Sequence, residues 1–314
     1  MATVISGSLA HDYIMDFPDK FRNHILPEKL HILNVCFVVN KLRKSFGGTA
    51  GNIAYTLRLL GSEPLIVSGI GRDGAEYLAH LRKHGIRTKY IGLDRDTLTC
   101  SAFITTDEDD NQVTAFYGGP VPKNVPALKR VKERFSFAII SPPNNLEIAR
   151  RHMAEGAELG LKLIFDPGQN VAHFRPAELR KMIARSRMVI GNDYEMAVLV
   201  KRTGWSVPRL AAKTEVLITT LGEKGSLLQT RKGESIKIAS CPPAKLTDPT
   251  GAGDAFRAGF LAGLEKNYAL KTCARMGSVA ASFAIEKYGT QEHAFCRAEF
   301  CKRYKSTYNE SLKL

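Results

Sequence analysis

The sequence predicts an α/β fold: a doubly wound, mostly parallel sheet flanked by helices, with a small β lid. Short apolar runs rich in β-branched residues alternate with amphipathic segments of helix length, most of which end at glycine. The apolar runs are nearly continuous, as in strands that helices cover on both faces. At 314 residues and 44% hydrophobic residues, the chain can bury such a core. We expect one domain over residues 1–314.

The strands and helices follow each other in the order that βαβ units require. The predicted strands are 3–8, 64–71, 135–141, 161–166, 187–192 and 215–220. The predicted helices are 51–61, 75–85, 145–160 and 194–204.

Two segments near the N-terminal end interrupt this order. Residues 99–119 read as two alternating strands around a polar turn, DEDDNQ, which is a β-hairpin pattern. Residues 12–45 are irregular and separate the first strand from the first clear helix. We expect a lid formed by about 12–45 and 97–119 that excludes water from a site. The alternative is a hairpin that only extends the main sheet.

Composition limits the function without deciding it. Lys and Arg exceed Asp and Glu by 14, which favours nucleotides, phosphorylated metabolites or nucleic acid as partners. No run approaches the ~18 apolar residues of a membrane span, and the first residues lack the pattern of a secretory signal. The six cysteines never form C-x-x-C, so free thiols are expected. A cytoplasmic protein is the corresponding expectation.

Two glycine-rich turns give weak signals. GIGRDG (69–74) with Asp94 matches the spacing of a dinucleotide-binding turn. A full strand and helix precede it, however, so a simple turn with Asp73 as helix N-cap is the preferred interpretation. TTLGEKGS (219–226) follows a strand and has glycines spaced to let backbone approach a ligand.

DPTGAGDAFRAGF, residues 248–260, carries a stronger signal. Gly251, Ala252 and Gly253 leave backbone N–H groups uncovered at a helix N-terminus, which together with the helix dipole form an anion site. Asp254 follows in the first turn. It either accepts a proton from a hydroxyl that attacks a phosphate or acts only as an N-terminal capping charge. Spacing alone leaves both interpretations open.

This segment resembles the second signature of the PfkB family of sugar and nucleoside kinases, which have the ribokinase-like fold. GGTAGNIAYTLRLLG (47–61) resembles the first signature, Asn192-Asp193-Tyr194-Glu195 resembles the family's N-x-x-E element, and GSLAHD (7–12) resembles its opening strand. The motifs occur in family order over nearly the whole chain. Within the family, the N-terminal third is most similar to bacterial adenosine and nucleoside kinases.

The resemblance implies a role for each matching residue. Asp254 would be the catalytic base, with Gly251, Ala252 and Gly253 as the anion hole. Asn192 and Glu195 would serve the Mg²⁺ ion, although the same pair could be a helix capping box. The sugar would be bound by Asp12, Gly48 and Asn52.

The nucleotide-binding residues are also implied by the resemblance. Thr220, Gly222 and Gly225 would line ADP, and the predicted late helix 278–289 would flank adenine with Ser282 and Tyr288. Asp248 and Thr250 could supply oxygens to a K⁺ ion, as in some relatives. Arg257 is expected at the surface.

The acceptor is predicted from the lid. A nucleoside needs an aromatic or apolar wall for its base, and Phe37, Phe103, Phe116 and Tyr117 are the candidates. Alternation places Phe116 and Tyr117 on opposite faces. We choose Phe116, with core packing as the competing explanation, and keep Phe37 in the substrate-binding set.

The resulting hypothesis is a kinase that uses ATP and Mg²⁺ to phosphorylate the 5′-hydroxyl of a purine nucleoside, adenosine above all, and releases ADP. Its partners would be the nucleoside and ATP, with no nucleic acid or membrane, in a monomer or homodimer. The alternatives are a ribokinase or other sugar kinase, a nucleotide sensor or nucleic-acid binder on a kinase fold, and a dinucleotide enzyme.

Overall fold

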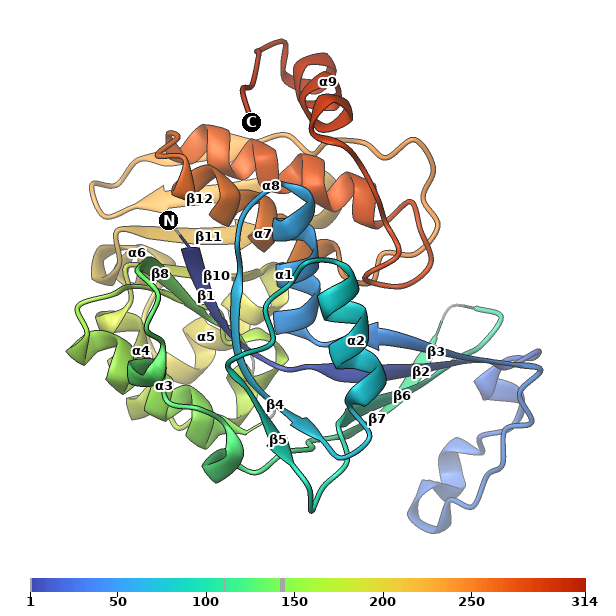
Figure 1. Cartoon of the computed structure of the whole chain (residues 1–314). Helices are drawn as coiled ribbons and strands as arrows, with labels where there is room; N and C mark the ends of the chain where they lie inside the picture. The colour runs from blue at the N-terminus through green and yellow to red at the C-terminus, as the bar shows by residue number, and fades with distance from the viewer. Residues whose placement is uncertain (1, 110, 142–144) are drawn as a thin grey trace.

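The computed structural model describes residues 2–109, 111–141 and 145–314 and contains two sheets (Figure 1). The main sheet has nine strands in the order β13-β12-β11-β10-β9-β8-β1-β4-β5. Its strands are β1 Ala2–Ser6, β4 Leu65–Gly71, β5 Ile91–Asp94, β8 Phe135–Ile140, β9 Lys162–Phe165, β10 Met188–Asn192, β11 Val216–Thr220, β12 Ser226–Thr230 and β13 Ser235–Ile238. The seven strands from β11 to β5 pair in parallel, whereas β12 and β13 are antiparallel.

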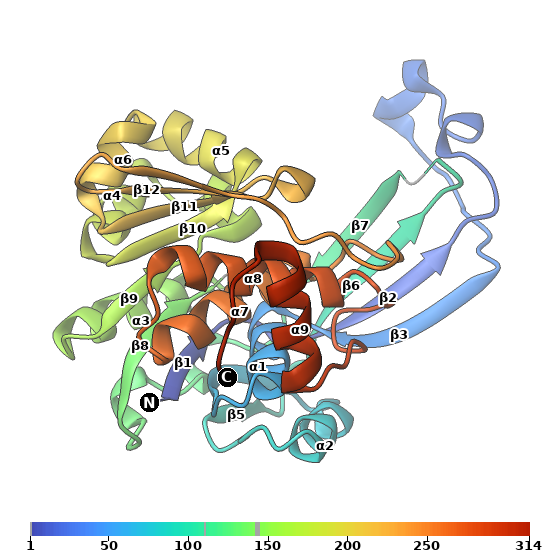
Figure 2. The same cartoon turned by 90° about the horizontal axis from the view of Figure 1, so that it is seen from above.

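Helices cover both faces of this sheet (Figure 2). They are α1 Thr49–Leu59, α2 Ala75–Lys83, α3 Leu146–Glu158, α4 Pro176–Arg185, α5 Asp193–Thr203, α6 Val207–Lys213, α7 Ala252–Glu265, α8 Leu270–Ala284 and α9 Arg297–Tyr308. One buried cluster joins alternate strand residues to α1, α7 and α8, and a second joins the intervening residues to α3, α4 and α5. The predicted doubly wound fold is therefore confirmed.

The sequence located the six predicted strands but not every element. All six correspond to strands of the main sheet, and the four predicted helices correspond to α1, α2, α3 and α5. The short strands β5, β12 and β13, which lie at or next to the edges of the sheet, were not predicted because each has few buried residues. The predicted late helix 278–289 is wrong at its end, since α8 stops at Ala284.

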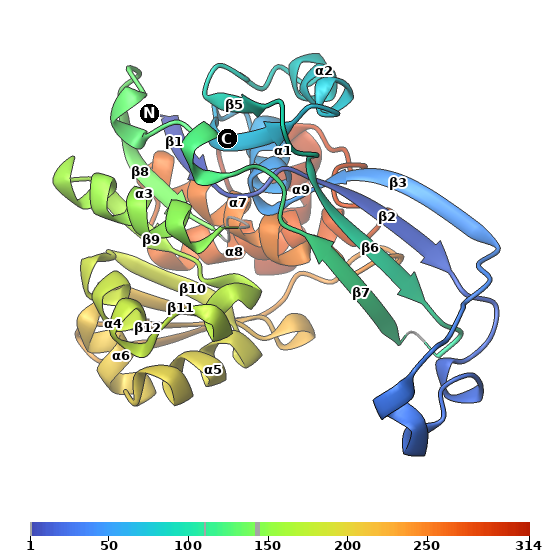
Figure 3. The ribbon, with the colours of Figure 1, turned by 90° about the horizontal axis from the view of Figure 1, so that it is seen from below.

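The lid is a separate sheet that projects from the main body (Figure 3). Its order is β3-β2-β6-β7, with β2 Ala10–Asp16, β3 Lys41–Gly47, β6 Cys100–Thr106 and β7 Gln112–Tyr117. The alternative of an edge hairpin on the main sheet is therefore wrong. Within the predicted segment 12–45, the middle is not strand: 3₁₀ turns occupy Phe21–Asn23 and Pro27–Ile32 at the far end of the lid. Residue 110 of the predicted hairpin turn lies outside the described residues.

The register of the lid strands determines which side chains share a face. Asp12 pairs with Ala102 on β6, and Ala102 pairs with Phe116 on β7. Directly paired residues point to the same side of a sheet, so these three share one face. Tyr13, Phe103 and Tyr117 belong to the opposite face by the same alternation.

The remaining predictions from composition have simple outcomes. All six cysteines are free thiols. In the described part of the chain, no helix is both long and apolar enough to cross a membrane.

Candidate active site

The anion-binding turn forms where the sequence predicted it. Gly251 is the N-cap of α7 and has φ 81°, a conformation that favours glycine. The first N–H groups of a helix have no partner within the helix and can bind an anion. Here the Ala252 N–H makes a long contact of 3.3 Å with the Pro249 carbonyl oxygen. A Cβ atom at Gly253 would lie 2.6 Å from Nη1 of Arg257. Glycine at 253 therefore leaves room for a guanidinium directly beneath the turn.

Asp254 lies in the first turn of α7 and its carboxylate is bound by a side chain from another element. Nδ2 of Asn52, on α1, donates to Oδ2 of Asp254 at 2.8 Å. Burial raises the pKa of Asp254 to about 6 from its ordinary 3.8, while Arg257 and Asn52 lower it. A carboxylate held by a distant asparagine, with a pKa just below neutrality, is suited to accept a proton. The geometry favours this interpretation over a simple cap.

Asp12 lies against Gly47, and the neighbouring Gly48 lies against the Ser8 backbone. Gly48 precedes α1 with φ 84°, and a Cβ there would lie 2.6 Å from the Ser8 carbonyl oxygen. A Cβ at Gly47 would lie 2.0 Å from Oδ2 of Asp12, so the carboxylate rests against this backbone. Burial, together with the smaller effects of the charges of Asp254 and Asp248, raises the pKa of Asp12 to about 7. The two carboxyl groups of Asp12 and Asp254 therefore lie close enough for their charges to interact.

The prediction that Arg257 is a surface residue is wrong. Its side chain is 10% exposed, and it binds Asp166, the residue that follows β9, with Nε–Oδ2 at 2.5 Å and Nη2–Oδ1 at 2.8 Å. Nη2 also lies 3.9 Å from Oε2 of Glu195. The surface prediction failed because its partner is 91 residues away in the chain. Spacing along one helix cannot reveal such a partner.

Asn192 and Glu195 form a capping box at the start of α5. Oδ1 of Asn192 accepts from the Glu195 N–H at 2.7 Å, and Oε2 of Glu195 accepts from the Asn192 N–H at 2.8 Å. Among the described residues, no group of three His, Cys, Asp or Glu side chains could hold a metal ion. Mg²⁺ commonly keeps several waters and uses one or two carboxylates plus substrate phosphates. A carboxylate such as that of Glu195 is the type of group that this mode of binding uses.

A cavity of about 580 Å³ runs from the anion-binding turn to α8. Of the predicted residues, Thr220, Gly222, Gly225, Ala252, Gly253 and Ser282 line it. Its apolar wall was missed by the sequence analysis: Pro242, Pro243, Leu246, Phe256, Ala281 and Ile285. The Pro-Pro pair after β13 was the available signal. The size and the mixture of apolar wall and backbone donors are suited to a nucleotide.

Of the two predicted adenine contacts, Ser282 lines this cavity and Tyr288 does not. Ser282 lines the cavity, but its hydroxyl donates to the Val279 carbonyl and accepts from Arg303. Tyr288 lies beyond the end of α8, and the guanidinium of Arg43 on β3 stacks on its ring at 4.3 Å. Tyr288 therefore contacts the lid and is not part of the cavity wall.

The two aromatic residues predicted to bind the base, Phe116 and Phe37, lie in different parts of the lid. Phe116 shares the face of Asp12 and is 54% exposed, so core packing does not explain it. Phe37 packs against Phe17 and Phe21 at ring-centroid distances of 4.9 and 4.8 Å. At about 3.3 Å per strand residue, Phe17 lies roughly 16 Å along the lid from Asp12. The structure brings Phe116, but not Phe37, to the Asp12 face.

The oxygens proposed for K⁺ are largely engaged. Oδ1 of Asp248 accepts from the Thr250 N–H at 2.9 Å, and Oδ2 accepts from the Gly289 N–H at 3.0 Å. The carboxylate therefore joins the anion-binding turn to the loop after α8. A cation here would depend on carbonyl oxygens of the two loops.

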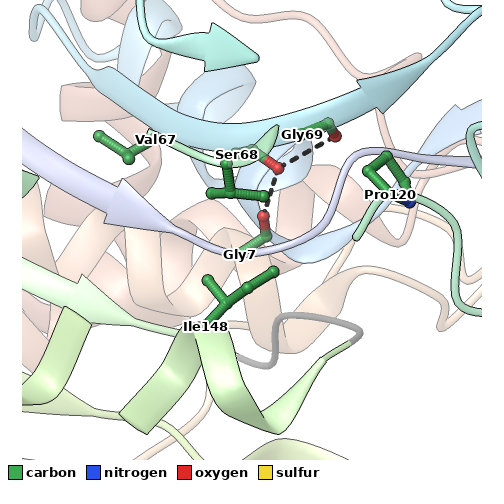
Figure 4. Close-up of a pocket in the computed structure, with 7 residues that line it drawn as sticks. Gly7, Val67, Ser68, Gly69, Pro120 and Ile148 are labelled. Atoms are coloured by element: carbon green, nitrogen blue, oxygen red, sulfur yellow. Dashed lines mark hydrogen bonds between the residues drawn. The ribbon is translucent and has the colours of Figure 1, made fainter. Parts of the chain in front are cut away.

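The GIGRDG turn has a structural explanation. Gly74, not Asp73, is the N-cap of α2, so the predicted cap is wrong. Asp73 instead accepts from the N–H and hydroxyl of Thr99, both at 2.7 Å. The nearby cavity beside Ser68 and Gly69 is only about 10 Å³, room for at most one water (Figure 4). A dinucleotide does not fit there.

Comparisons with known proteins agree with this geometry. Residues 25–294 match the model of the pfkB family carbohydrate kinases. A nucleoside kinase of Methanocaldococcus jannaschii is 32% identical over 299 residues, covering 91% of this chain and 90% of the relative. The nucleoside kinase of Burkholderia thailandensis has been solved with inosine (TM-score 0.91, 36% identity, 99% of this chain and 100% of the other). Its complex with ADP and inosine gives a TM-score of 0.88 at 37% identity, covering 99% and 97%.

Proposed function

This chain belongs to the pfkB family of carbohydrate kinases, and from that premise we propose that it transfers the γ-phosphoryl group of ATP to the 5′-hydroxyl of a purine nucleoside, adenosine first of all. In coarser terms, the protein is an ATP-dependent nucleoside kinase, a phosphotransferase with a hydroxyl group as acceptor. The observation that carries the finer proposal is the position of Asp254 between the nucleotide-sized cavity and the Asp12 face of the lid.

The reaction follows from the groups around Asp254. The nucleoside 5′-OH gives its proton to the Asp254 carboxylate while its oxygen forms a bond to the γ-phosphorus. The bond between the γ-phosphorus and the bridging oxygen breaks, and ADP leaves with that electron pair. The N–H groups at the start of α7 stabilise the charge on the transferring group. Asp12 accepts hydrogen bonds from the ribose hydroxyls.

We propose that Mg²⁺ is held by the phosphates and, through water, by Glu195 and Asn192. Bound there, the ion would neutralise charge on the phosphates. The buried Arg257 lies beside the same carboxylate and supplies a permanent positive charge beneath Gly253. A K⁺ ion near Asp248 and Thr250 is a further part of the proposal.

The lid supports a nucleoside over a bare sugar. The face that carries Asp12 also presents Ile14, Ile104 and Phe116, by the register of β2, β6 and β7. Phe116 lies two strand spacings from Asp12, about 10 Å, which suits a base attached to a ribose held at Asp12. Stacking on an aromatic ring contributes about 1–3 kcal/mol per base. A bare sugar would leave this face exposed.

The test is ADP release from ATP and Mg²⁺ with adenosine, inosine, guanosine, cytidine, ribose or fructose 6-phosphate. Turnover of purine nucleosides with little turnover of ribose is expected. Asp254→Asn keeps the size of the side chain but cannot accept the proton as a carboxylate does. We expect its kcat to fall about 10²–10⁴-fold with unchanged affinity for ADP. Preference for ribose or fructose 6-phosphate would instead support a sugar kinase.

A further inference from the structure

We propose that Gln291 is a positioning residue for Asp254, because its side-chain amide fixes the orientation of Asn52 so that Asn52 can only donate to the base. This inference rests on the proposed role of Asp254. It concerns a side chain that follows α8 and lies outside the anion-binding turn, the lid and the nucleotide cavity.

The argument starts from the carboxylate. An ionised carboxylate only accepts hydrogen bonds, so Asn52 must turn its NH₂ group to Asp254. The Asn52 oxygen then points away and needs donors. Nε2 of Gln291 donates to it at 2.9 Å. The Thr290 hydroxyl lies 2.8 Å away, but its single proton is shared with the Phe46 carbonyl oxygen at 3.0 Å. Because Nε2 of Gln291 can only donate, it excludes the flipped amide of Asn52.

Gln291 is itself fixed in one orientation. It is 3% exposed, and its Nε2 also donates to the Tyr77 hydroxyl at 2.7 Å. Its oxygen lies 3.1 Å from Nε2 of His80 on α2. Since an amide oxygen accepts, His80 carries the proton on Nε2. Each group in this series therefore donates to the next: His80 to Gln291, Gln291 to Asn52, and Asn52 to Asp254.

The Gln291 amide also connects Asp254 to the end of β3, where the lid joins the main body. Tyr77 is fully buried, and its hydroxyl donates to the Gly47 carbonyl at 2.6 Å. Gly47 ends β3 and lies against the Asp12 carboxylate. A Cβ at Gly51 would lie 1.9 Å from the Tyr77 hydroxyl and 2.8 Å from Nε2 of Gln291. The glycine of α1 leaves space that this network fills.

The consequence for the reaction is a base that stays ionised. Burial and the charges of Asp166 and Glu195 favour the protonated form of Asp254, and Arg257 and Asn52 oppose them. Asp12 also lies within electrostatic range of Asp254, but with its pKa raised to about 7 it is mostly neutral at pH 6. Of the two groups that keep Asp254 ionised, Arg257 is held by Asp166, and Asn52 is held by Gln291 and Thr290. Loss of the Gln291 donor would free Asn52 to turn its oxygen to Asp254.

The experiment compares two variants, Gln291→Glu and Gln291→Met. The carboxylate of Gln291→Glu would offer an acceptor where Asn52 needs a donor, so we expect the acid limb of the kcat profile with adenosine to move up by about one pH unit. From a wild-type pKa of about 6, this shift lowers the ionised fraction of the base about fivefold at pH 6 and about tenfold at pH 5 and below. The Met variant should shift in the same direction by less, because Thr290 remains. KM for ATP should not change, and activity should recover at about pH 8.5, well above the shifted pKa of the base. Gln229→Glu on β12 is the matched control, and we expect a wild-type profile for it.

Each outcome decides one question. A folded Gln291→Glu or Gln291→Met variant with the wild-type pH profile would overturn the inference. So would a loss that is equal at every pH, since only a shifted titration recovers at high pH. If the Glu variant does not fold, the Met variant decides alone. An active Asp254→Asn variant would instead overturn the proposed role of the base.

Discussion

The surfaces proposed for the two substrates differ in how closely their side chains are packed. The cavity proposed for ATP lies in the main body and is lined by glycine turns, prolines and the packed helices α7 and α8. The face proposed for the nucleoside lies on the four-stranded lid, where Phe116 is largely exposed. Packing therefore fixes the first surface, while the second depends on side chains that have few neighbours. Substitutions should accordingly affect stability in the first region and substrate selection in the second.

The largest effect on stability is expected beneath the anion-binding turn. Arg257→Met leaves Asp166 buried without its cation, which typically costs about 3–5 kcal/mol. Urea unfolding would measure it. Arg43→Met on the lid is the matched control, because Arg43 is exposed and stacks only on Tyr288, so about 0.5–1 kcal/mol is expected. If Arg257→Met and Arg43→Met lowered the free energy of unfolding equally, the proposed difference in packing between the main body and the lid would be wrong.

Phe116→Ala tests the second surface, the face of the lid proposed for the nucleoside. Loss of stacking should raise KM for adenosine by about 5- to 150-fold, corresponding to 1–3 kcal/mol, while the free energy of unfolding stays within about 0.5 kcal/mol of wild type. Tyr117→Ala, on the opposite face, is the control and should leave KM for adenosine near the wild-type value. If both variants raise KM alike, the assignment of the faces is wrong.

The difference between the regions also decides what the sequence could predict. Buried strands and the DPTGAGD turn are local patterns, so six strands of the main sheet and the place of Asp254 in the first turn of α7 were predicted correctly. Arg257 was placed at the surface because its partner Asp166 is distant in the chain. Alternation within one strand separated Phe116 from Tyr117 but did not say which of them faces the site. Phe37 lies in a segment without periodicity, where no pattern indicates the direction of a side chain. Asn52 was identified, but its contact with Asp254 joins two helices across 202 residues.

A pH profile tests the environment of Asp254. With a pKa of about 6, the base should be lost as pH falls, so kcat/KM for adenosine should drop tenfold per pH unit below about 6. The effect of pH on the free energy of unfolding should be opposite to its effect on activity. The folded pKa is above the ordinary value of 3.8, so the folded state binds the proton more tightly and gains stability as pH falls from about 6 to 4. Asp254→Asn should show neither this acid limb nor this gain.

The smallest effect is expected at Phe37. Its ring packs with Phe17 and Phe21 at the far end of the lid, about 16 Å from the Asp12 end of β2. Phe37→Ala should therefore leave KM for adenosine unchanged within about twofold, unlike Phe116→Ala. Loss of the aromatic cluster should instead open residues 17–40 to limited proteolysis, because this segment has no strand to hold it. A rise in KM for adenosine comparable to that of Phe116→Ala would mean that this segment closes over the nucleoside, and the site would then extend along the whole lid.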